Sequence, residues 1–244
     1  MTQLKSISAS KSHLGTVRKL NEDSCLALPE RGLWVVADGM GGHQAGDYAS
    51  QLIVNTLGSV GEFRSLGEFV GEVESLLLEV NARLVDDTAD LPPGSVIGST
   101  VVALLTFNRQ AAFLWAGDSR VYRLRGEELR QLTRDHSEIE ELIAAGEVTR
   151  ETAEDHPSAN VITRAVGALT AEDAFEIGIT DLRPGDRFLL CSDGLYRVVS
   201  SEEMRRHLAA LPPDEVCHRL IELALARQCS DNVTVISVEF SASD

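Results

Sequence analysis

One apolar run in this chain ends in an acidic residue that is followed by several glycines. Residues 35–50 read VVADGMGGHQAGDYAS, so a pattern typical of a buried strand runs into Asp38 and then through Gly39, Gly41 and Gly42. A tight turn does not need three glycines, and a buried strand does not need a carboxylate at its end. Because glycine lets other atoms come close to the backbone, the stretch predicts a bound group beside Asp38.

The same context recurs at three more aspartates. Asp118 in FLWAGDSR and Asp193 in FLLCSDGL each follow an apolar run, and Asp231 in CSDNVTVISV comes just before one. Any one of them is consistent with an ordinary turn, since aspartate and glycine favour turns. Four carboxylates so close to a core would repel one another and lose hydration. A hard cation removes both costs, and oxygen ligands without His or Cys select Mg²⁺ or Mn²⁺ over zinc. The pattern therefore predicts that Asp38 is a metal ligand.

An arginine precedes two further acids in the stretch TVRKLNEDS. Arg18 comes four residues before Glu22 and five before Asp23. A lone arginine in such a stretch is typical of a surface ion pair. Beside a cluster of carboxylates and metal ions, however, a planar guanidinium is suited to hold a phosphoryl group through two hydrogen bonds.

Hydrophobic periodicity predicts both strands and helices. An apolar stripe from Leu66 to Leu84 steps by three and four residues, which is typical of an amphipathic helix. Similar patterns follow Ala45 and the PPDEV stretch near the end of the chain. The consecutive strands favour an α+β fold over strict alternation, and two sheets packed together with helices outside would cover strands that are apolar on both faces. Apolar runs rich in β-formers predict strands at 23–28, 33–37, 99–107, 111–116, 121–124, 187–191 and 232–240.

The length and composition favour one domain. We interpret residues 1–244 as a single domain, in which the acidic, weakly apolar segment 137–160 forms a small flap on the surface. The net charge of −16 argues against a nucleic-acid partner. No apolar run approaches the ~18 residues of a membrane span, and the N-terminus lacks a signal-peptide pattern. We therefore expect a cytoplasmic protein. The four scattered cysteines do not indicate disulfides or zinc, and Cys191 reads as a core residue.

Eight motifs, taken in order, resemble those of a known family. RKLNED, ADGMGGHQAGD, GSTVV, AGDSRVY, RDHS, ITRAVG, LLCSDGL and SDNVTVI are similar to the motifs of bacterial metal-dependent serine/threonine protein phosphatases, the PP2C or PPM family. The resemblance covers nearly the whole chain. It implies a four-layer α-β-β-α sandwich of two central antiparallel sheets flanked by helices. It also implies hydrolysis of phosphoserine and phosphothreonine in signalling proteins by a water molecule that metal ions activate.

The resemblance assigns roles to individual residues. Asp38 would bridge two Mn²⁺ or Mg²⁺ ions with help from the Gly39 carbonyl, and Asp193 and Asp231 would complete the first ion's ligands. Asp118 resembles the ligand of a third, weaker ion, a site that Asp193 would share. Glu22 and Asp23 would hold metal-bound waters, and Arg18 would bind phosphate.

One position departs from the eukaryotic branch of the family. Met40 stands where those relatives carry a histidine proposed to protonate the leaving group. His43 is the nearest alternative in sequence, but at the start of a predicted helix it would disfavour the imidazolium that an acid must be. We favour a role for His43 in capping or packing.

Two rival functions stay open on the sequence. One is a binding module that recognises phosphoproteins without catalysis, and the other is a different metal-dependent phosphoesterase such as a nuclease.

The natural counterpart of a phosphatase is a serine/threonine kinase whose substrates it shares. We expect a monomer, and close relatives are associated with type VI secretion clusters.

Overall fold

The protein is built around two antiparallel sheets. The computed structural model describes residues 4–41, 45–89, 91–92, 94–153, 156–170 and 175–242. One sheet, the first, has the strand order β1-β11-β10-β7-β8, and the second has the order β2-β3-β5-β6-β9 with β4 beside β3. The first sheet contains β1 (Leu4–His13), β7 (Arg120–Arg125), β8 (Glu128–Gln131), β10 (Arg187–Cys191) and β11 (Val233–Ala242), and the second contains β2 (Asp23–Leu28), β3 (Leu33–Met40), β4 (Gly98–Ser99), β5 (Val101–Phe107), β6 (Gln110–Ala116) and β9 (Glu176–Asp181).

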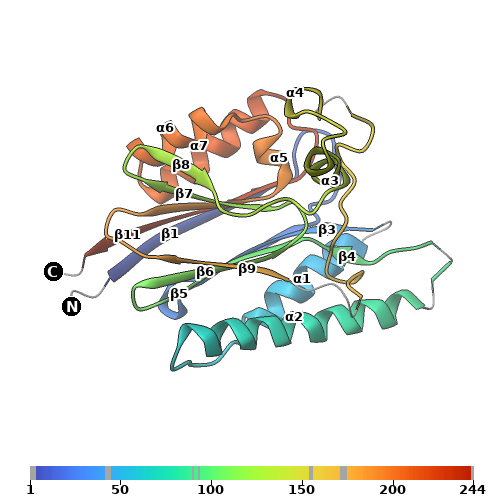
Figure 1. Cartoon of the computed structure of the whole chain (residues 1–244), viewed down its shortest axis with the longest axis horizontal. Helices are drawn as coiled ribbons and strands as arrows, with labels where there is room; N and C mark the ends of the chain where they lie inside the picture. Colours follow the sequence, from blue (N-terminus) through green and yellow to red (C-terminus); the bar gives the residue numbers. More distant parts are fainter. Residues whose placement is uncertain are drawn as a thin grey trace.

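Helices cover the outer face of each sheet, which makes four layers (Figure 1). The pair α1 (Ala45–Leu57) and α2 (Leu66–Ala89) packs on the second sheet. The pair α6 (Ser201–Ala210) and α7 (Pro213–Ala226) packs on the first sheet, next to the short helix α5 (Asp193–Tyr196). The predicted α+β sandwich of two antiparallel sheets flanked by helices is confirmed.

The alternation of side chains along each strand explains why the central strands are apolar throughout. In β3, Leu33 and Val35 join the core under α1 and α2, whereas Trp34 and Val36 point the other way into the core between the sheets. All four side chains have an exposed fraction of 0%. Because successive residues of a strand face opposite sides, a strand covered on both faces has no place for a polar side chain until it reaches the end of the sheet.

The apolar stripe of α2 is also confirmed. Leu66, Phe69, Val73, Leu77 and Leu84 are buried along one side of the helix against the second sheet. Val80 is buried with them, whereas most of the charged side chains of the helix are exposed. Burial of this stripe, rather than helix propensity alone, holds so long a helix in place.

Strands β1, β8 and β9 and helix α6 are among the elements that were not predicted from the sequence. Strand β1 reads LKSISASKSH, and its serines and lysines mask a strand that pairs with β11 over its whole length. Helix α6 begins at a capping box, in which the Ser200 side chain accepts from the Glu203 amide and the Glu203 carboxylate accepts from the Ser200 amide. That signature was present in the sequence.

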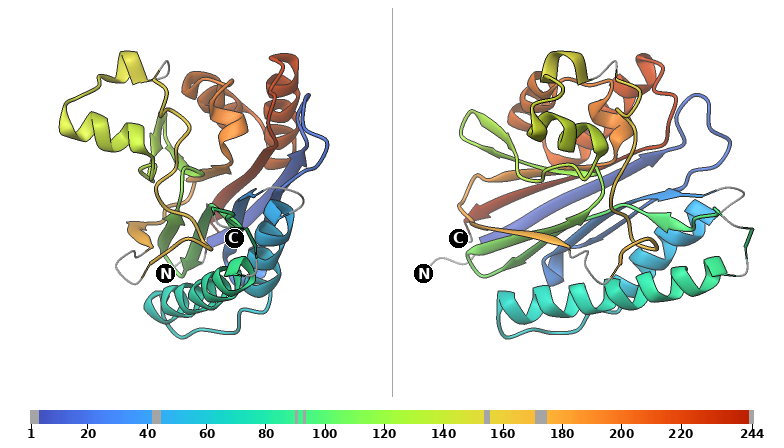
Figure 2. Two further views of the ribbon diagram at one scale, coloured as in Figure 1. Left: turned by 90° about the vertical axis from the view of Figure 1, so that its right-hand side faces the viewer. Right: turned by 45° about the vertical axis from the view of Figure 1, so that its right-hand side comes forward.

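The segment from 137 to 160 stands apart from the four layers. It contains two short helices, α3 (Glu138–Ala145) and α4 (Arg150–Ala153), which lie to one side of the sandwich (Figure 2). Residues 154 and 155 fall outside the described part of the chain. Among the described residues, no helix is both long enough and apolar enough to cross a membrane.

Candidate metal centre

Five aspartates lie at the same end of the sandwich because of where the strands start and stop. Asp23 opens β2 and sits opposite Asp38 in the β2–β3 register. Asp118 comes shortly after the end of β6 and Asp193 shortly after the end of β10, while Asp231 comes shortly before β11. The strand ends thus bring residues that are up to 208 positions apart in the sequence to one edge.

The charges of these aspartates act on one another. Burial and the neighbouring carboxylates of Asp23, Asp193, Asp118 and Asp231, in that order, raise the pKa of Asp38 well above its usual range. Burial, and next the charge of Asp118, likewise raise the pKa of Asp193. Carboxylates with raised pKa values are costly to ionise together, and a bound cation would remove that cost.

The inner end of the site contains a polar atom without a partner. Asp23 is buried, and its Oδ2 accepts a hydrogen bond of 2.7 Å from the Ser192 hydroxyl. Its Oδ1 is buried with no hydrogen-bond partner. Burial is the first cause of the raised pKa of this carboxyl. An unpaired carboxylate oxygen within a set of oxygen donors fits a hard divalent ion.

Two neighbouring elements fix the backbone around Asp38. The Thr100 amide donates to the Asp38 carbonyl at 2.8 Å, and the Asp38 amide donates to the Thr100 hydroxyl at 3.2 Å. A side chain at Gly39 would meet the Gly46 carbonyl oxygen at 2.0 Å and the Glu22 carbonyl oxygen at 2.7 Å. The sequence predicted that glycine here admits a close approach, and at Gly39 that approach is made by the first turn of α1 and by the Glu22 backbone.

Glu22 and Arg18 lie on the rim of the site. Burial raises the pKa of the Glu22 carboxyl, and the positive charge of Arg18 opposes this rise. Arg18 is half exposed, and its Nη2 donates to Oδ2 of Asp231 at 2.8 Å. That hydrogen bond is the main reason that the pKa of Arg18 is raised. The structure thus brings Arg18 and Glu22 next to the aspartates.

Asn232 is a residue of the site that sequence reasoning missed. Its Nδ2 donates to the carbonyl oxygens of Leu14 and Leu20, each at 3.0 Å, and its Oδ1 accepts from the Glu22 amide at 2.8 Å. These three hydrogen bonds tie down both ends of the loop that carries Arg18. Asn232 is buried and follows Asp231 directly, so it links the loop to the aspartates.

A second group that sequence reasoning missed surrounds Asp118. The Tyr196 hydroxyl lies 3.2 Å from Oδ2 of Asp118, and the Arg120 guanidinium stacks 3.4 Å above the Tyr196 ring. Arg120 is held in turn by two-pronged hydrogen bonds to Asp135. Arg197 contacts Asp193 at 2.7 Å and approaches Asp118 at 3.8 Å.

The aspartates do not form a closed cage by themselves. Among the described residues, no three His, Cys, Asp or Glu side chains converge tightly enough to hold an ion. Two of the aspartates are paired with arginines instead, Asp231 with Arg18 and Asp193 with Arg197. Met40 lies at the end of β3, whereas Gly42 and His43 lie outside the described residues.

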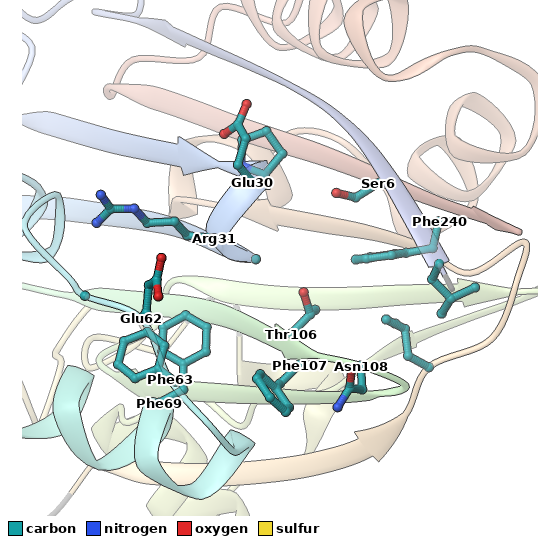
Figure 3. Close-up of a pocket in the computed structure, with 15 residues that line it drawn as sticks. Ser6, Glu30, Arg31, Glu62, Phe63, Phe69, Thr106, Phe107, Asn108 and Phe240 are labelled. Atoms are coloured by element: carbon teal, nitrogen blue, oxygen red, sulfur yellow. The ribbon is translucent and has the colours of Figure 1, made fainter. Parts of the chain in front are cut away.

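A separate cleft of about 530 Å³ lies at the other end of the sandwich. Figure 3 shows Glu30 and Arg31 of the short helix η1 (Pro29–Arg31) on one side of it, with Phe63 and Phe69 on another. Phe240, near the end of β11, also lines it. None of the site residues predicted from the sequence borders this cleft, so its size does not indicate the chemistry.

Comparisons with known proteins agree on one family. A sequence model described as "Protein phosphatase 2C" matches residues 11–216. The serine/threonine protein phosphatase PstP of Mycobacterium tuberculosis is 37% identical over 228 residues, which are 93% of this chain. The chain spans only 44% of the length of that relative.

Two solved structures resemble the whole fold. One is PppA, a key regulatory component of T6SS in Pseudomonas aeruginosa, with 44% sequence identity and a TM-score of 0.89 over 98% of this chain and 100% of that one. The other is the catalytic domain of PstP in complex with two manganese ions, with 35% identity and a TM-score of 0.86 over 98% of this chain and 99% of that one. The chain belongs to the protein phosphatase 2C family.

Proposed function

We propose that this chain is a protein phosphatase that hydrolyses phosphoserine and phosphothreonine with the help of two Mn²⁺ or Mg²⁺ ions. The observation that carries the proposal is that five aspartates lie at one end of the sandwich, where four of them raise the pKa of Asp38, next to the half-exposed guanidinium of Arg18. PstP, a serine/threonine protein phosphatase whose catalytic domain has been solved with two manganese ions, supports it.

The residues at the strand ends would have different roles in metal binding. Asp38, at the centre of the cluster, would hold the ions together with the carbonyl of Gly39. Asp193 and Asp231 would complete the first ion's ligands. Asp118 would serve a third, weaker ion.

The residues around the cluster would position water and phosphate. Glu22 and Asp23 would hold water molecules next to the ions. Arg18 can turn toward a phosphoryl group at little cost, because its side chain is half exposed and its present partner, Asp231, is itself 38% exposed. Its planar guanidinium then donates two parallel hydrogen bonds to the phosphoryl oxygens. When bound, the ions lower the pKa of water and compensate the negative charge of the phosphoryl group.

A cysteine nucleophile does not fit this site. Cys25, Cys191 and Cys229 each lie two residues from one of the aspartates, and burial raises the pKa of all three thiols. A thiolate, which is the reactive form, is therefore not available there. Direct attack by water requires no covalent intermediate on the protein.

We place residues 1–244 in one phosphatase domain, with the flap 137–160 beside the site. The partners would be phosphorylated proteins and a kinase that shares those substrates. Because such a kinase consumes ATP made inside the cell, the pair would act in the cytoplasm. The protein would work as a monomer, and its likeness to PppA supports a role in a T6SS.

The decisive experiment compares three substrates after metal ions have been stripped and Mn²⁺ has been restored. A phosphoserine peptide should be hydrolysed only with Mn²⁺ or Mg²⁺, while a phosphodiester and DNA should not be cleaved. Asp38→Ala, Asp193→Ala and Asp231→Ala should each be nearly inactive yet folded. Full turnover in excess chelator would contradict the proposal. Binding of the phosphopeptide without turnover would indicate a binding module instead.

A further inference from the structure

The loop between β1 and β2 exposes three large apolar side chains within seven residues. The exposed fraction is 39% for Leu14, 69% for Val17 and 38% for Leu20. No other stretch of seven residues in the described part of the chain exposes as many. Single exposed apolar side chains are normal on a protein surface, whereas exposed apolar side chains that gather at one place indicate a contact with another molecule.

Hydrogen bonds hold the backbone of this loop in place. The amide and the hydroxyl of Thr16 both donate to the Cys229 carbonyl, each at 2.9 Å. Nδ2 of Asn232 donates to the carbonyls of both Leu14 and Leu20, so these two residues lie side by side at the base of the loop. The exposed side chains therefore stand on a fixed backbone, and a ligand that contacts them does not have to order the loop first.

The same loop carries the guanidinium that we propose to bind phosphate. Val17 directly precedes Arg18, whose Nη2 donates to Asp231 of the candidate metal centre. The loop lies at the same end of the sandwich as α5, the short helix that Asp193 opens (Figure 1). An extended peptide advances about 3.3–3.6 Å per residue. A phosphoserine held at Arg18 therefore brings the residues one or two positions away from it within reach of the apolar side chains of the loop.

We propose that Val17, together with Leu14 and Leu20, binds an apolar side chain of the substrate that lies within two positions of the phosphoserine or phosphothreonine. This assignment rests on the proposed function, because that function places the phosphoryl group at Arg18. It adds the class of substrate, since phosphorylated segments with apolar neighbours would be hydrolysed in preference to those with polar neighbours. Partial burial of a side chain of the size of valine corresponds to a preference of about tenfold.

Two phosphoserine peptides that differ only in their flanks test the preference. One has leucine and the other has glutamine at the two positions on either side of the phosphoserine. With Mn²⁺ restored, the wild type should show a kcat/KM about tenfold higher for the leucine peptide. Val17→Ser should lose most of this ratio, whereas Val17→Ile, which keeps an apolar side chain, should retain it.

The matched control is an equally exposed apolar residue outside the loop. Ile7, in the middle of β1, has an exposed fraction of 62%, and Ile7→Ser should keep the ratio of the wild type. Equal ratios in the wild type and in Val17→Ser would overturn the proposal. Self-association of the chain that Val17→Ser abolishes, with no change in the peptide ratio, would overturn it in favour of a contact between copies.

Peptides that cannot be hydrolysed separate this proposal from the proposed function. In phosphonate analogues of the two peptides a methylene group replaces the ester oxygen, so that fluorescence anisotropy measures affinity without turnover. The leucine analogue should bind the wild type about tenfold more tightly than the glutamine analogue, and Val17→Ser should lose most of the difference. If the wild type shows this difference but hydrolyses neither peptide, the proposed function fails and the role of Val17 stands. Equal affinities for the two analogues, or binding of neither, would refute the role of Val17.

Discussion

Replacement of Asn232 should both destabilise the fold and displace Arg18. The side chain makes three hydrogen bonds, two to the carbonyls of Leu14 and Leu20 and one from the Glu22 amide. A hydrogen bond of this kind contributes about 1 kcal/mol net, and more when a buried partner is left unpaired. We therefore expect Asn232→Ala to lose about 3 kcal/mol of unfolding free energy.

The loss should be visible as a lower melting temperature. For a domain of this size, 1 kcal/mol corresponds to about 2–4 °C, so Asn232→Ala should melt about 6–12 °C below the wild type. The matched control is Asn21→Ala in the same loop, whose amide donates to Ser12 at 2.7 Å in an exposed setting and whose Oδ1 accepts a longer hydrogen bond of 3.3 Å from the Asp23 amide. The control should change the melting temperature by no more than about 3 °C. Equal shifts for the two variants would refute the account of Asn232.

Kinetics then separate a positioning role from a general loss of stability. If Asn232 acts through the loop that carries Arg18, Asn232→Ala should raise KM for a phosphopeptide at temperatures where the protein stays folded. In an Arg18→Ala background, the same substitution should raise KM much less, because the guanidinium that the loop positions is already absent. Additive effects on KM in the double variant would show that Asn232 does not act through Arg18.

Three further outcomes are expected. His43→Ala should slow hydrolysis of a phosphoserine peptide and of an aryl phosphate to a similar, modest degree. The leaving group of the peptide needs a proton, whereas that of the aryl phosphate does not. A loss of about a hundredfold confined to the peptide would therefore make His43 the general acid. Exchange of residues 137–160 for the flap of a relative should alter peptide preference more than aryl phosphate hydrolysis, and equal effects would indicate a structural role only. Arg125→Met should cost about 3 kcal/mol in a urea unfolding experiment, because it leaves the fully buried Asp186 carboxylate without its two-pronged partner. The exposed Arg83→Met should cost under about 1 kcal/mol, and equal costs for these two arginines would contradict that reasoning.

The aspartates of the site could be predicted because a local pattern marks them. Asp38 ends the apolar run of β3, Asp118 and Asp193 follow strands that are apolar on both faces, and a carboxylate at such a position is costly without a partner. The core of β3 and the stripe of α2 could be predicted for the same reason, since periodic burial leaves a direct trace in the sequence. These features depend on near neighbours in the chain.

Asn232 and Arg197 could not be predicted in this way. Asn232 contacts Leu14, Leu20 and Glu22, which lie 210 or more positions away, and nothing near it in the sequence indicates those partners. Arg197 looks like any polar residue after a short helix until the fold places Asp118 beside it. Strand β1 was missed because a sequence rich in serine and lysine lacks the usual strand composition. Its pairing with β11 over ten residues stabilises the strand instead.

The metal centre itself is tested most directly by melting temperatures with and without Mn²⁺. For the wild type stripped of metal ions, Mn²⁺ at about 100 times its dissociation constant should add about 2.7 kcal/mol, or about 5–11 °C. Asp38→Asn removes the carboxylate whose pKa four neighbours raise, so the stripped variant should melt no lower than the stripped wild type and should gain little from Mn²⁺. A variant that melts lower without metal, yet gains as much as the wild type from Mn²⁺, would contradict the assignment of Asp38 to the metal centre.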